Sequence, residues 1–461
     1  MHALDLLPVQ EEDTLLLRAD DEMVRRGGFG LVFSGFVGIL ETTGRLWVAW
    51  VPCLSGDQPF HPGEKRMQRQ AVLERIAKVA KNPLEAVLQW KERTGGKVMG
   101  CLSCMPFFSP EELVHAAGFL PVGIWGAEMA VSRADAKMQS FACSVARTSL
   151  EMGLRGMLKV CDGFLFPSTC DAFQNLSEVW KESMDSPCFE VVFPKQVSRP
   201  SAVSFLVSQF SKLQRDLEEF SGVTVPPEAV RRSFGLYNEN RAQMRRLDRL
   251  RVQDADFLTA LQMVEIVLAS SYLPREEHTS LIRSLLSGAP QGKGQIAGPG
   301  EPDRDRIRLL LSGVMPRPLE ILSVMESAGA WIVGDDMGLG SLYYSLDIPD
   351  GDDPLADLAR ACLRYPPCST VHSDDEERFD SLLARVLQTE AEGIVLFAVK
   401  FCEPEFFDYP QLKERLEKEG VPVLLLETEL GTAETGSLRT RVEAFLESLR
   451  ARKRGAAREG N

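Results

Sequence analysis

Strand patterns and helix patterns alternate along most of this chain, and this alternation constrains its fold more than any other feature. Within residues 162–194, a strand pattern (DGFLFPS) is followed by a helix pattern (AFQNLSEVWKES) and a second strand pattern (CFEVVFP). The alternation returns within residues 306–453, with GIVLFAV, QLKERLEKEG and VPVLLLET. Strands joined by helices form parallel sheets that helices cover. We therefore expect an α/β protein with two Rossmann- or flavodoxin-like lobes.

A helical stretch separates the two alternating runs. Residues 202–286 contain four helix patterns and no convincing strand, and a Gly/Pro-rich segment follows at 288–303. This organisation predicts an N-terminal extension, a first α/β lobe, a helical segment with its linker, and a second α/β lobe. The expected boundaries are 1–64, 65–200, 201–300 and 301–461.

The first 64 residues differ from the rest, with clustered Gly and Trp and little helical periodicity. The apolar run 28–40 predicts a buried hairpin or loop. Arg25 and Arg26 precede this run and leave an export signal as the alternative. Helical periodicity starts at Arg66, so Met67 is an alternative natural start of the protein.

Two helix starts are readable from local patterns. Periodic apolar residues predict helix over 66–95. The segment 109–118, SPEELVHAAG, combines a capping-box pattern at Ser109 with a terminal glycine.

Composition excludes several classes of protein. The chain has 461 residues and a net charge of −14, so it has no basic excess to neutralise nucleic acid. No run of 18 apolar residues is present, so we expect no transmembrane helix. Its ten cysteines are irregularly spaced, which fits metal or redox chemistry in a reducing cytoplasm.

Three cysteines occupy equivalent places in the predicted elements. Cys170 follows the strand pattern at 163–168, Cys402 follows the one at 393–399, and Cys143 begins a helix pattern. In open parallel sheets, functional groups gather beyond the carboxyl ends of the strands. A single cysteine is more often a small buried hydrophobe. Three thiols without a histidine partner favour an iron–sulfur cluster over structural zinc, which requires four ligands.

Other candidates are weaker. Cys101 and Cys104 form the one C-x-x-C, with a redox dithiol as its functional interpretation. Residues 333–341, VGDDMGLGS, follow a strand pattern and are a candidate lining of the cleft. We expect five cysteines to be structural or incidental: Cys53, Cys161, Cys188, Cys362 and Cys368. No pattern assigns a separate catalytic acid, base or nucleophile.

Several segments, in order, carry a resemblance to a known family. They are SPEELVHAAGFLPVGIWG, QSFACSVARTSLEMGLRG, CDGFLFPSTCDAFQNLSEVWKE, GDDMGLGS and FAVKFCEPEFFDYPQLKERLEKEGVPVLLLETEL. Together they resemble the benzoyl-CoA reductase / 2-hydroxyacyl-CoA dehydratase subunit family over about residues 85–450. LPVGIWG and STCDAFQNLSEVW look most like the smaller substrate-reducing subunit of ATP-dependent benzoyl-CoA reductases.

The resemblance implies a cofactor and partners. It places the ligands of a [4Fe-4S] cluster at Cys143, Cys170 and Cys402, with such a cluster in each of two homologous subunits. It implies an ATP-hydrolysing iron–sulfur activator that supplies single low-potential electrons. A CoA thioester would receive the electron, and the resulting ketyl radical anion would lead to ring reduction or to loss of a hydroxyl group. The chain has no G-x-x-x-x-G-K-[ST] motif, consistent with an ATP site on the activator.

Two departures from the family pattern leave alternatives open. Residues 1–64 have no recognised counterpart. A related branch holds a double-cubane cluster with a cysteine after the second-lobe turn, where this chain has Met337. That difference favours a single cubane, while Cys101 or Cys104 keeps a double-cubane reductase of small substrates as an alternative. A non-catalytic partner subunit of the same complex is another.

Overall fold

The computed structural model describes residues 30–33, 36–40, 46–50, 62–102, 108–287, 306–370, 375–430 and 435–459. The chain divides into two compact units, Met1–Lys65 and Arg66–Asn461. In the first unit, β1 (Gly30–Phe33), β2 (Phe36–Leu40) and β3 (Leu46–Trp50) form an antiparallel sheet in that order. β1 and β2 form the hairpin expected within residues 28–40.

The first lobe of the larger unit is built on a parallel sheet with the order β5-β4-β6-β7. Its strands are β4 (Lys97–Cys101), β5 (Phe119–Gly123), β6 (Gly163–Ser168) and β7 (Cys188–Val192). The accompanying helices are α2 (Pro62–Lys81), α3 (Pro83–Thr94), α4 (Glu111–Ala116), η1 (Ala134–Ala136), α5 (Ser144–Leu154), α6 (Asp171–Ser183) and α7 (Ser201–Ser221). In chain order the strands run 2-1-3-4, the flavodoxin-like order.

The second lobe repeats this topology. Its parallel sheet has the order β11-β10-β8-β9, which is again 2-1-3-4 when read from the opposite edge. The strands are β8 (Ile307–Gly313), β9 (Ala330–Met337), β10 (Gly393–Val399) and β11 (Val423–Thr428). The helices are α11 (Glu320–Ser327), η2 (Ser341–Tyr344), α12 (Pro354–Leu363), α13 (Asp375–Thr389), α14 (Glu403–Lys418) and α15 (Thr435–Glu459). The expected two-lobed α/β fold is therefore confirmed.

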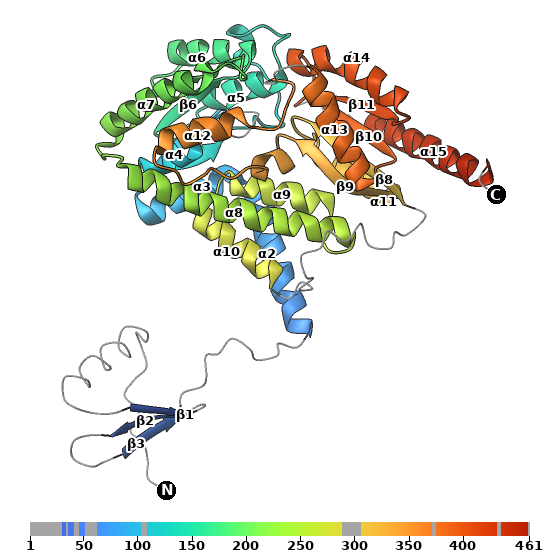
Figure 1. Cartoon of the computed structure of the whole chain (residues 1–461). Helices are drawn as coiled ribbons and strands as arrows, with labels where there is room; N and C mark the ends of the chain where they lie inside the picture. Colours follow the sequence, from blue (N-terminus) through green and yellow to red (C-terminus); the bar gives the residue numbers. More distant parts are fainter. Residues whose placement is uncertain are drawn as a thin grey trace. The chain divides into compact units, whose positions relative to one another are not determined.

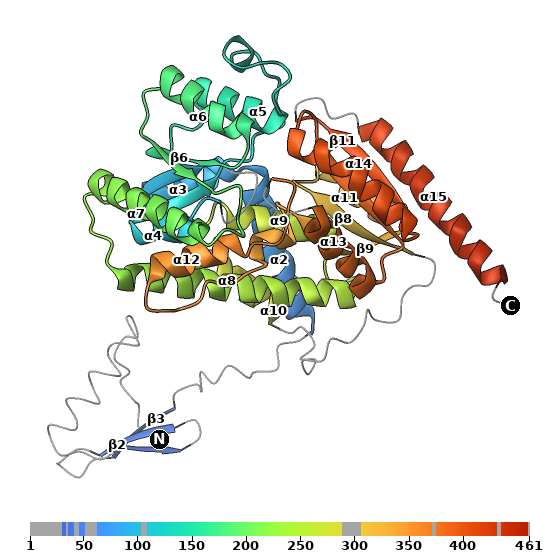
Figure 2. The ribbon, with the colours of Figure 1, turned by 45° about the horizontal axis from the view of Figure 1, so that its top comes forward.

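A helical segment packs against both lobes (Figures 1 and 2). It consists of α8 (Pro227–Gln253), α9 (Ala260–Ser270) and α10 (Arg275–Leu286), whereas α7, the first of the four helices expected between 202 and 286, packs on β7 of the first lobe. α8 contacts α4 of the first lobe and β9 and η2 of the second, and α9 contacts α11. α12, although encoded between β9 and β10, packs on α7 and α8. None of the described helices is both long and apolar enough to cross a bilayer.

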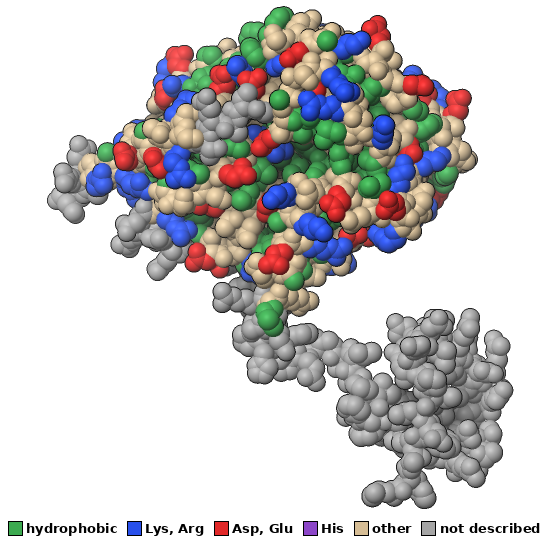
Figure 3. Space-filling model, turned by 180° about the vertical axis from the view of Figure 1, so that it is seen from behind, with side chains coloured by type: hydrophobic (Ala, Val, Ile, Leu, Met, Phe, Trp, Pro, Cys, Tyr) green, Lys and Arg blue, Asp and Glu red, His purple; other side chains and the backbone are tan. Residues whose placement is uncertain are grey.

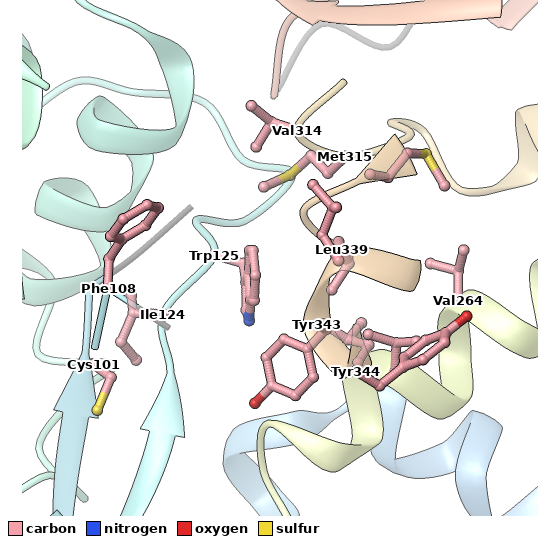
Figure 4. Packing of buried hydrophobic residues seen from close by; sticks show 14 of the residues in the cluster. Cys101, Phe108, Ile124, Trp125, Val264, Val314, Met315, Leu339, Tyr343 and Tyr344 are labelled. Carbon is pink, nitrogen blue, oxygen red and sulfur yellow. The ribbon is translucent and has the colours of Figure 1, made fainter. Parts of the chain in front are cut away.

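The larger of two hydrophobic clusters among the described residues runs through both lobes, and the smaller lies in the second lobe. Figure 4 shows Phe108, Ile124 and Trp125 of the first lobe facing Met315 and Leu339 of the second. In addition, Trp125 and Tyr343 place their ring centroids 6.4 Å apart. On the face seen in Figure 3, hydrophobic side chains also gather in a hollow that charged side chains of both signs surround.

Two local expectations need correction. The helix expected over 66–95 is two helices, because Pro83 starts α3 after Asn82. The capping box at Ser109 is absent: Pro110 is the N-cap of α4, and the Ser109 hydroxyl has no hydrogen-bond partner within the described residues. Glu112 instead accepts a hydrogen bond from Arg241 of α8 at 2.6 Å. The expected linker at 288–303 lies outside the described residues.

Candidate metal centre

Each of the three cysteines caps the start of a helix. Cys170 follows β6 and is the N-cap of α6, and Cys402 follows β10 and is the N-cap of α14. Cys143 is the N-cap of α5. None of the thiols completes a capping hydrogen bond, although nearby N–H groups of each helix start lower its pKa. Three positive helix ends therefore point toward the sulfur atoms, which favours negative charge there.

The three thiols line one cavity of about 460 Å³. Cys143 and Cys170 come from the first lobe, and Cys402 comes from the second. The structure therefore brings together all three cysteines chosen from the sequence. The other residues that line the cavity are Met138, Gln139, Phe141, Ala142, Val145, Thr169, Asp171, Ala172, Phe173, Asn175, Lys195, Val314, Thr370, Val399, Phe401, Glu403, Pro404 and Phe407.

Without a bound cation, the thiols are held neutral. Burial raises the pKa of Cys143 to about 12 and raises the pKa of Cys170. It raises the pKa of Cys402 far beyond the ordinary range, and the nearby Glu405 carboxylate raises it further. Three thiolates at this place therefore require a positively charged group among them, and metal coordination deprotonates thiols outright.

This donor set fits a cluster rather than a single ion. Within the described residues, no three His, Cys, Asp or Glu side chains meet closely enough to hold one metal ion. In a cubane, each thiolate binds a different iron, so three sulfurs around a cavity need not converge on one point. Three cysteines would leave the fourth iron open to an exogenous ligand.

Hydrogen bonds join the two lobes beside the thiols. Ser144, next to Cys143, accepts a hydrogen bond from the Leu430 N–H at 3.1 Å. The guanidinium of Arg147 on α5 forms two ion pairs. Its nitrogen atoms lie 2.6 Å from Oδ1 of Asp135 and 3.4 Å from Oε1 of Glu429, which follows β11. These contacts fix the start of α5 against the second lobe and hence the position of Cys143 relative to Cys402.

Sequence reasoning missed Lys195, which is the one Lys or Arg among the described residues that line the cavity. It follows β7 and donates a hydrogen bond to the Thr169 carbonyl oxygen. Its positive charge lowers the pKa of Cys170, against the raising effect of burial. Its position after a strand of the parallel sheet was a signal that could have identified it.

Glu405 was also missed. It lies on the first turn of α14 and is buried, with Ser369 donating a hydrogen bond to one of its oxygens at 3.3 Å. Burial raises the pKa of Glu405 to about 7, and Arg378 partly opposes this rise. A carboxyl group next to Cys402 can therefore hold a proton near neutral pH.

The other sequence candidates lie elsewhere. None of residues 333–341 lines the cavity, so their expected place in the cleft was wrong. Asp335 instead accepts hydrogen bonds from the Met337 and Ser341 N–H groups, and a Cβ at Gly340 would meet its Oδ1 at 2.4 Å. These interactions make the segment a buried structural turn.

The other cysteines in the described part of the chain do not line the cavity either. Cys101 ends β4 and is buried, with Glu111 and Cys161 as its charged or ionisable neighbours. Cys188 starts β7, and Cys362 and Cys368 are buried. Cys53 and Cys104 lie outside the described residues.

A second buried polar cluster links the lobes through the helical segment. Arg275 of α10 contacts Glu111 of α4 at 2.5 Å and Tyr343 of η2 at 3.1 Å. Tyr343 in turn donates to Glu111 at 2.7 Å. The Arg275 guanidinium lies 4.4 Å from the centroid of the Tyr237 ring. These contacts join residues of both lobes and of the helical segment, so we interpret this cluster as structural.

The fold and the site define a class of protein: a two-lobed α/β chain whose lobes contribute cysteines to one cavity. Residues 106–449 match the family model described as 2-hydroxyglutaryl-CoA dehydratase, D-component, and the chain belongs to this family. The resemblance stated from the sequence is confirmed.

Curated relatives match almost over their full lengths. The chain is 31% identical to the lactoyl-CoA dehydratase subunit beta of Anaerotignum propionicum over 382 residues, covering 82% of this chain and 99% of that protein. It is 29% identical to the (R)-phenyllactyl-CoA dehydratase beta subunit of Clostridium sporogenes, covering 80% and 96%. It is 28% identical to a subunit of the benzoyl-CoA reductase of Thauera aromatica, covering 79% and 94%.

Proposed function

We propose that this chain is the iron–sulfur subunit of an enzyme that reduces or dehydrates a CoA thioester. The observation that carries the proposal is the convergence of Cys143, Cys170 and Cys402, each at a helix start, on one cavity. The relatives support it, because they are named as subunits of acyl-CoA dehydratases and of benzoyl-CoA reductase.

The three cysteines would hold a [4Fe-4S] cluster, which supplies single low-potential electrons when bound. The chain itself would position the three sulfur atoms and stabilise the negative charge of their thiolates. Three helix starts and the Lys195 ammonium favour thiolates, and the interlobe contacts of Ser144 and Arg147 fix the spacing of the sulfurs. Apolar lining residues such as Val145, Phe173 and Val399 limit the water in the cavity.

Two observations support the proposed protein partners: the sequence has no P-loop motif, and its relatives are named as subunits of larger enzymes. Reduction at such low potential needs an energy source, and the sequence contains no P-loop motif for ATP. We therefore propose an ATP-hydrolysing iron–sulfur activator as electron donor and a homologous second subunit as permanent partner, in the cytoplasm. The relatives are each named as one subunit of an enzyme, which supports an assembly of more than one chain.

Two observations support a single cubane over the double-cubane alternative. Met337 is buried and, like Cys101, does not line the cavity. Iron and sulfide content separates the two alternatives, at about four or about eight irons per chain. Turnover by the purified complex, compared with each subunit alone, tests the remaining alternative, a non-catalytic partner subunit.

The test of the cluster is anaerobic purification of three variants, Cys143→Ala, Cys170→Ala and Cys402→Ala. Each should lose most of its iron and its visible thiolate-to-iron absorption, because two thiolates hold a cubane weakly. Cys362→Ala is the matched control, since this buried cysteine lies away from the cavity, and it should keep both. A Cys170→Ala protein with full iron and sulfide content would refute the proposed ligand set.

A further inference from the structure

One carboxylate next to the cysteine cavity has a partner in each lobe. Glu429 follows β11, and its two oxygens accept hydrogen bonds from different side chains. Oε1 accepts one from Nη1 of Arg147 at 3.4 Å, and Oε2 accepts one from Nζ of Lys400 at 3.1 Å. Arg147 lies on α5 of the first lobe, whereas Lys400 lies in the turn between β10 and α14 of the second. We call Glu429, Arg147 and Lys400 the ionic clasp.

Both cations of the clasp lie beside cysteines that line the cavity. Arg147 is one helical turn after Cys143, and its backbone N–H donates a hydrogen bond to the Cys143 carbonyl oxygen at 3.1 Å. Lys400 is two residues before Cys402. A movement of either cation away from the carboxylate therefore shifts a segment that carries one of the thiols.

The turn that contains Lys400 is conformationally strained. Phe401 has a φ of +63°, in the left-handed region that a bulky side chain rarely adopts. Such a conformation persists where the surrounding contacts impose it. The Lys400 N–H donates a hydrogen bond to the Thr428 carbonyl oxygen at 2.7 Å, and the Lys400 ammonium binds Glu429. Two contacts with the end of β11 therefore hold this turn, and with it Cys402, in place.

The other partners of the two cations decide which contact matters more. The side chains of Arg147, Glu429 and Lys400 are 11%, 21% and 41% exposed. Arg147 has a second acidic partner in Asp135, at 2.6 Å, and would keep it without Glu429. Among the described residues, Glu429 is the one carboxylate that pairs with Lys400. Loss of the Glu429 charge therefore frees the turn that carries Cys402 more than it frees α5.

We propose that Glu429 is a positioning residue for Cys402, and that its ion pair with Lys400 controls the access of solutes to the thiols of the cavity. Breaking the pair lets the strained turn move away from the first lobe. The neutral hydrogen bond from the Leu430 N–H to Ser144 remains and limits the movement to that turn. The inference rests on contacts within the chain, so it does not depend on a bound cluster. Because salt screens the ion pair, access should increase with ionic strength.

The experiment measures how fast iodoacetamide labels each cysteine of the cluster-free full chain, resolved by mass spectrometry of its peptides. Glu429→Gln should speed labelling of Cys402 about three- to tenfold, because it leaves the Lys400 charge without its partner. Labelling of Cys143 should increase less. In the parent chain, a rise from about 0.05 to about 0.5 M salt should also speed labelling of Cys402, whereas the Glu429→Gln chain should respond little.

A second variant separates movement of the turn from a direct effect of charge on the thiol. Removal of a negative charge makes a nearby thiol easier to ionise, and removal of a positive charge makes it harder. Lys400→Gln should nevertheless speed labelling of Cys402, because it breaks the same ion pair. Lys400→Arg, which keeps the cation, should label at about the parent rate.

The matched control is Glu427→Gln, which removes an exposed carboxylate of β11 two residues earlier and should label at the parent rate. Three outcomes would overturn the inference: slower labelling of Cys402 in Lys400→Gln, no effect of salt on the parent chain, and an equal increase at Cys362, which would indicate general loosening. Iron and sulfide content of the reconstituted chains tests the proposed function separately. A chain that never holds a cluster defeats that function and leaves the labelling result intact.

Discussion

At the scale of single residues, two substitutions at Phe401 separate the effect of backbone strain on stability from the effect of losing the aromatic ring. Phe401→Ala keeps a Cβ at a φ of +63°, whereas Phe401→Gly removes the strain. We expect the glycine variant to be more stable than the alanine variant by about 1 kcal/mol, because strain relief exceeds the entropy that glycine adds to the unfolded chain. Urea denaturation of the two cluster-free proteins measures the difference.

The alanine and glycine substitutions at Phe407 are the control, and here the glycine variant should be the less stable of the two. Phe407 lies within α14, where glycine destabilises a helix by about 1 kcal/mol relative to alanine. If Phe401→Gly is instead the less stable member of its pair, the left-handed conformation is not what constrains this position.

At the scale of elements, buried hydrogen bonds hold α8, α9 and α10 together. His278 of α10 bonds to Asn240 of α8 through Nδ1, at 2.9 Å, and to the Ile266 carbonyl of α9 through Nε2, at 2.9 Å. Nε2 therefore donates and Nδ1 accepts, which requires the neutral imidazole. Burial lowers the pKa of His278 to about 3.

This lowered pKa predicts acid sensitivity of the helical segment. The unfolded chain takes up the imidazole proton near the ordinary pKa of 6.5, whereas the folded chain resists it down to about 3. The contribution of the neutral His278 to the free energy of unfolding is therefore fully present above pH 6.5. It falls toward pH 3, by up to about 1.4 kcal/mol per pH unit. His278→Gln should flatten this slope in urea titrations between pH 4 and 7. An unchanged slope would show that other groups cause it.

Elements with strong periodicity were predictable, and their ends were not. The apolar runs of β6 and β10 and the helix after β6 lie where the sequence placed them. The helix after β10 was expected from the pattern at 411–420, but α14 already begins at Glu403. Ser109 and Glu112 fit a capping box, but Glu112 forms a buried ion pair with Arg241 instead. Thr259 and Gln262 form the true capping box at the start of α9. Because the partner of Glu112 lies 129 positions away, the local pattern could not predict the outcome.

At the scale of the whole molecule, sequence reasoning could find the thiols but not their surroundings. Cys170 and Cys402 were identifiable because a parallel sheet brings strand ends to one edge. The grouping of Phe141 with Phe401 and Phe407 around the cavity depends on how two separate sheets face each other, and no local spacing encodes that relation. The same holds for Ser144 and Leu430, which pair across 286 positions.

Because the thiols come from both lobes, retention of a cluster should depend on contacts far from it. Tyr343 of η2 bonds to Glu111 and Arg275, and its loss leaves buried charged groups with one partner fewer. Tyr343→Phe should destabilise the chain by about 1–3 kcal/mol. It should also speed the loss of iron to a chelator several-fold, since larger movements between the lobes separate Cys402 from Cys143 and Cys170.

The control is Tyr409→Phe on α14, where the hydroxyl makes no hydrogen bond within the described residues and the ring lies near Lys413. This variant should release iron at the parent rate. The readout is the absorbance of the iron–chelator complex over time, with anaerobic protein at equal starting iron content. If Tyr343→Phe loses stability but releases iron no faster than Tyr409→Phe, the lobes are held together at the thiols themselves. The contacts of Ser144 and Arg147 would then suffice to set the spacing of the three sulfurs.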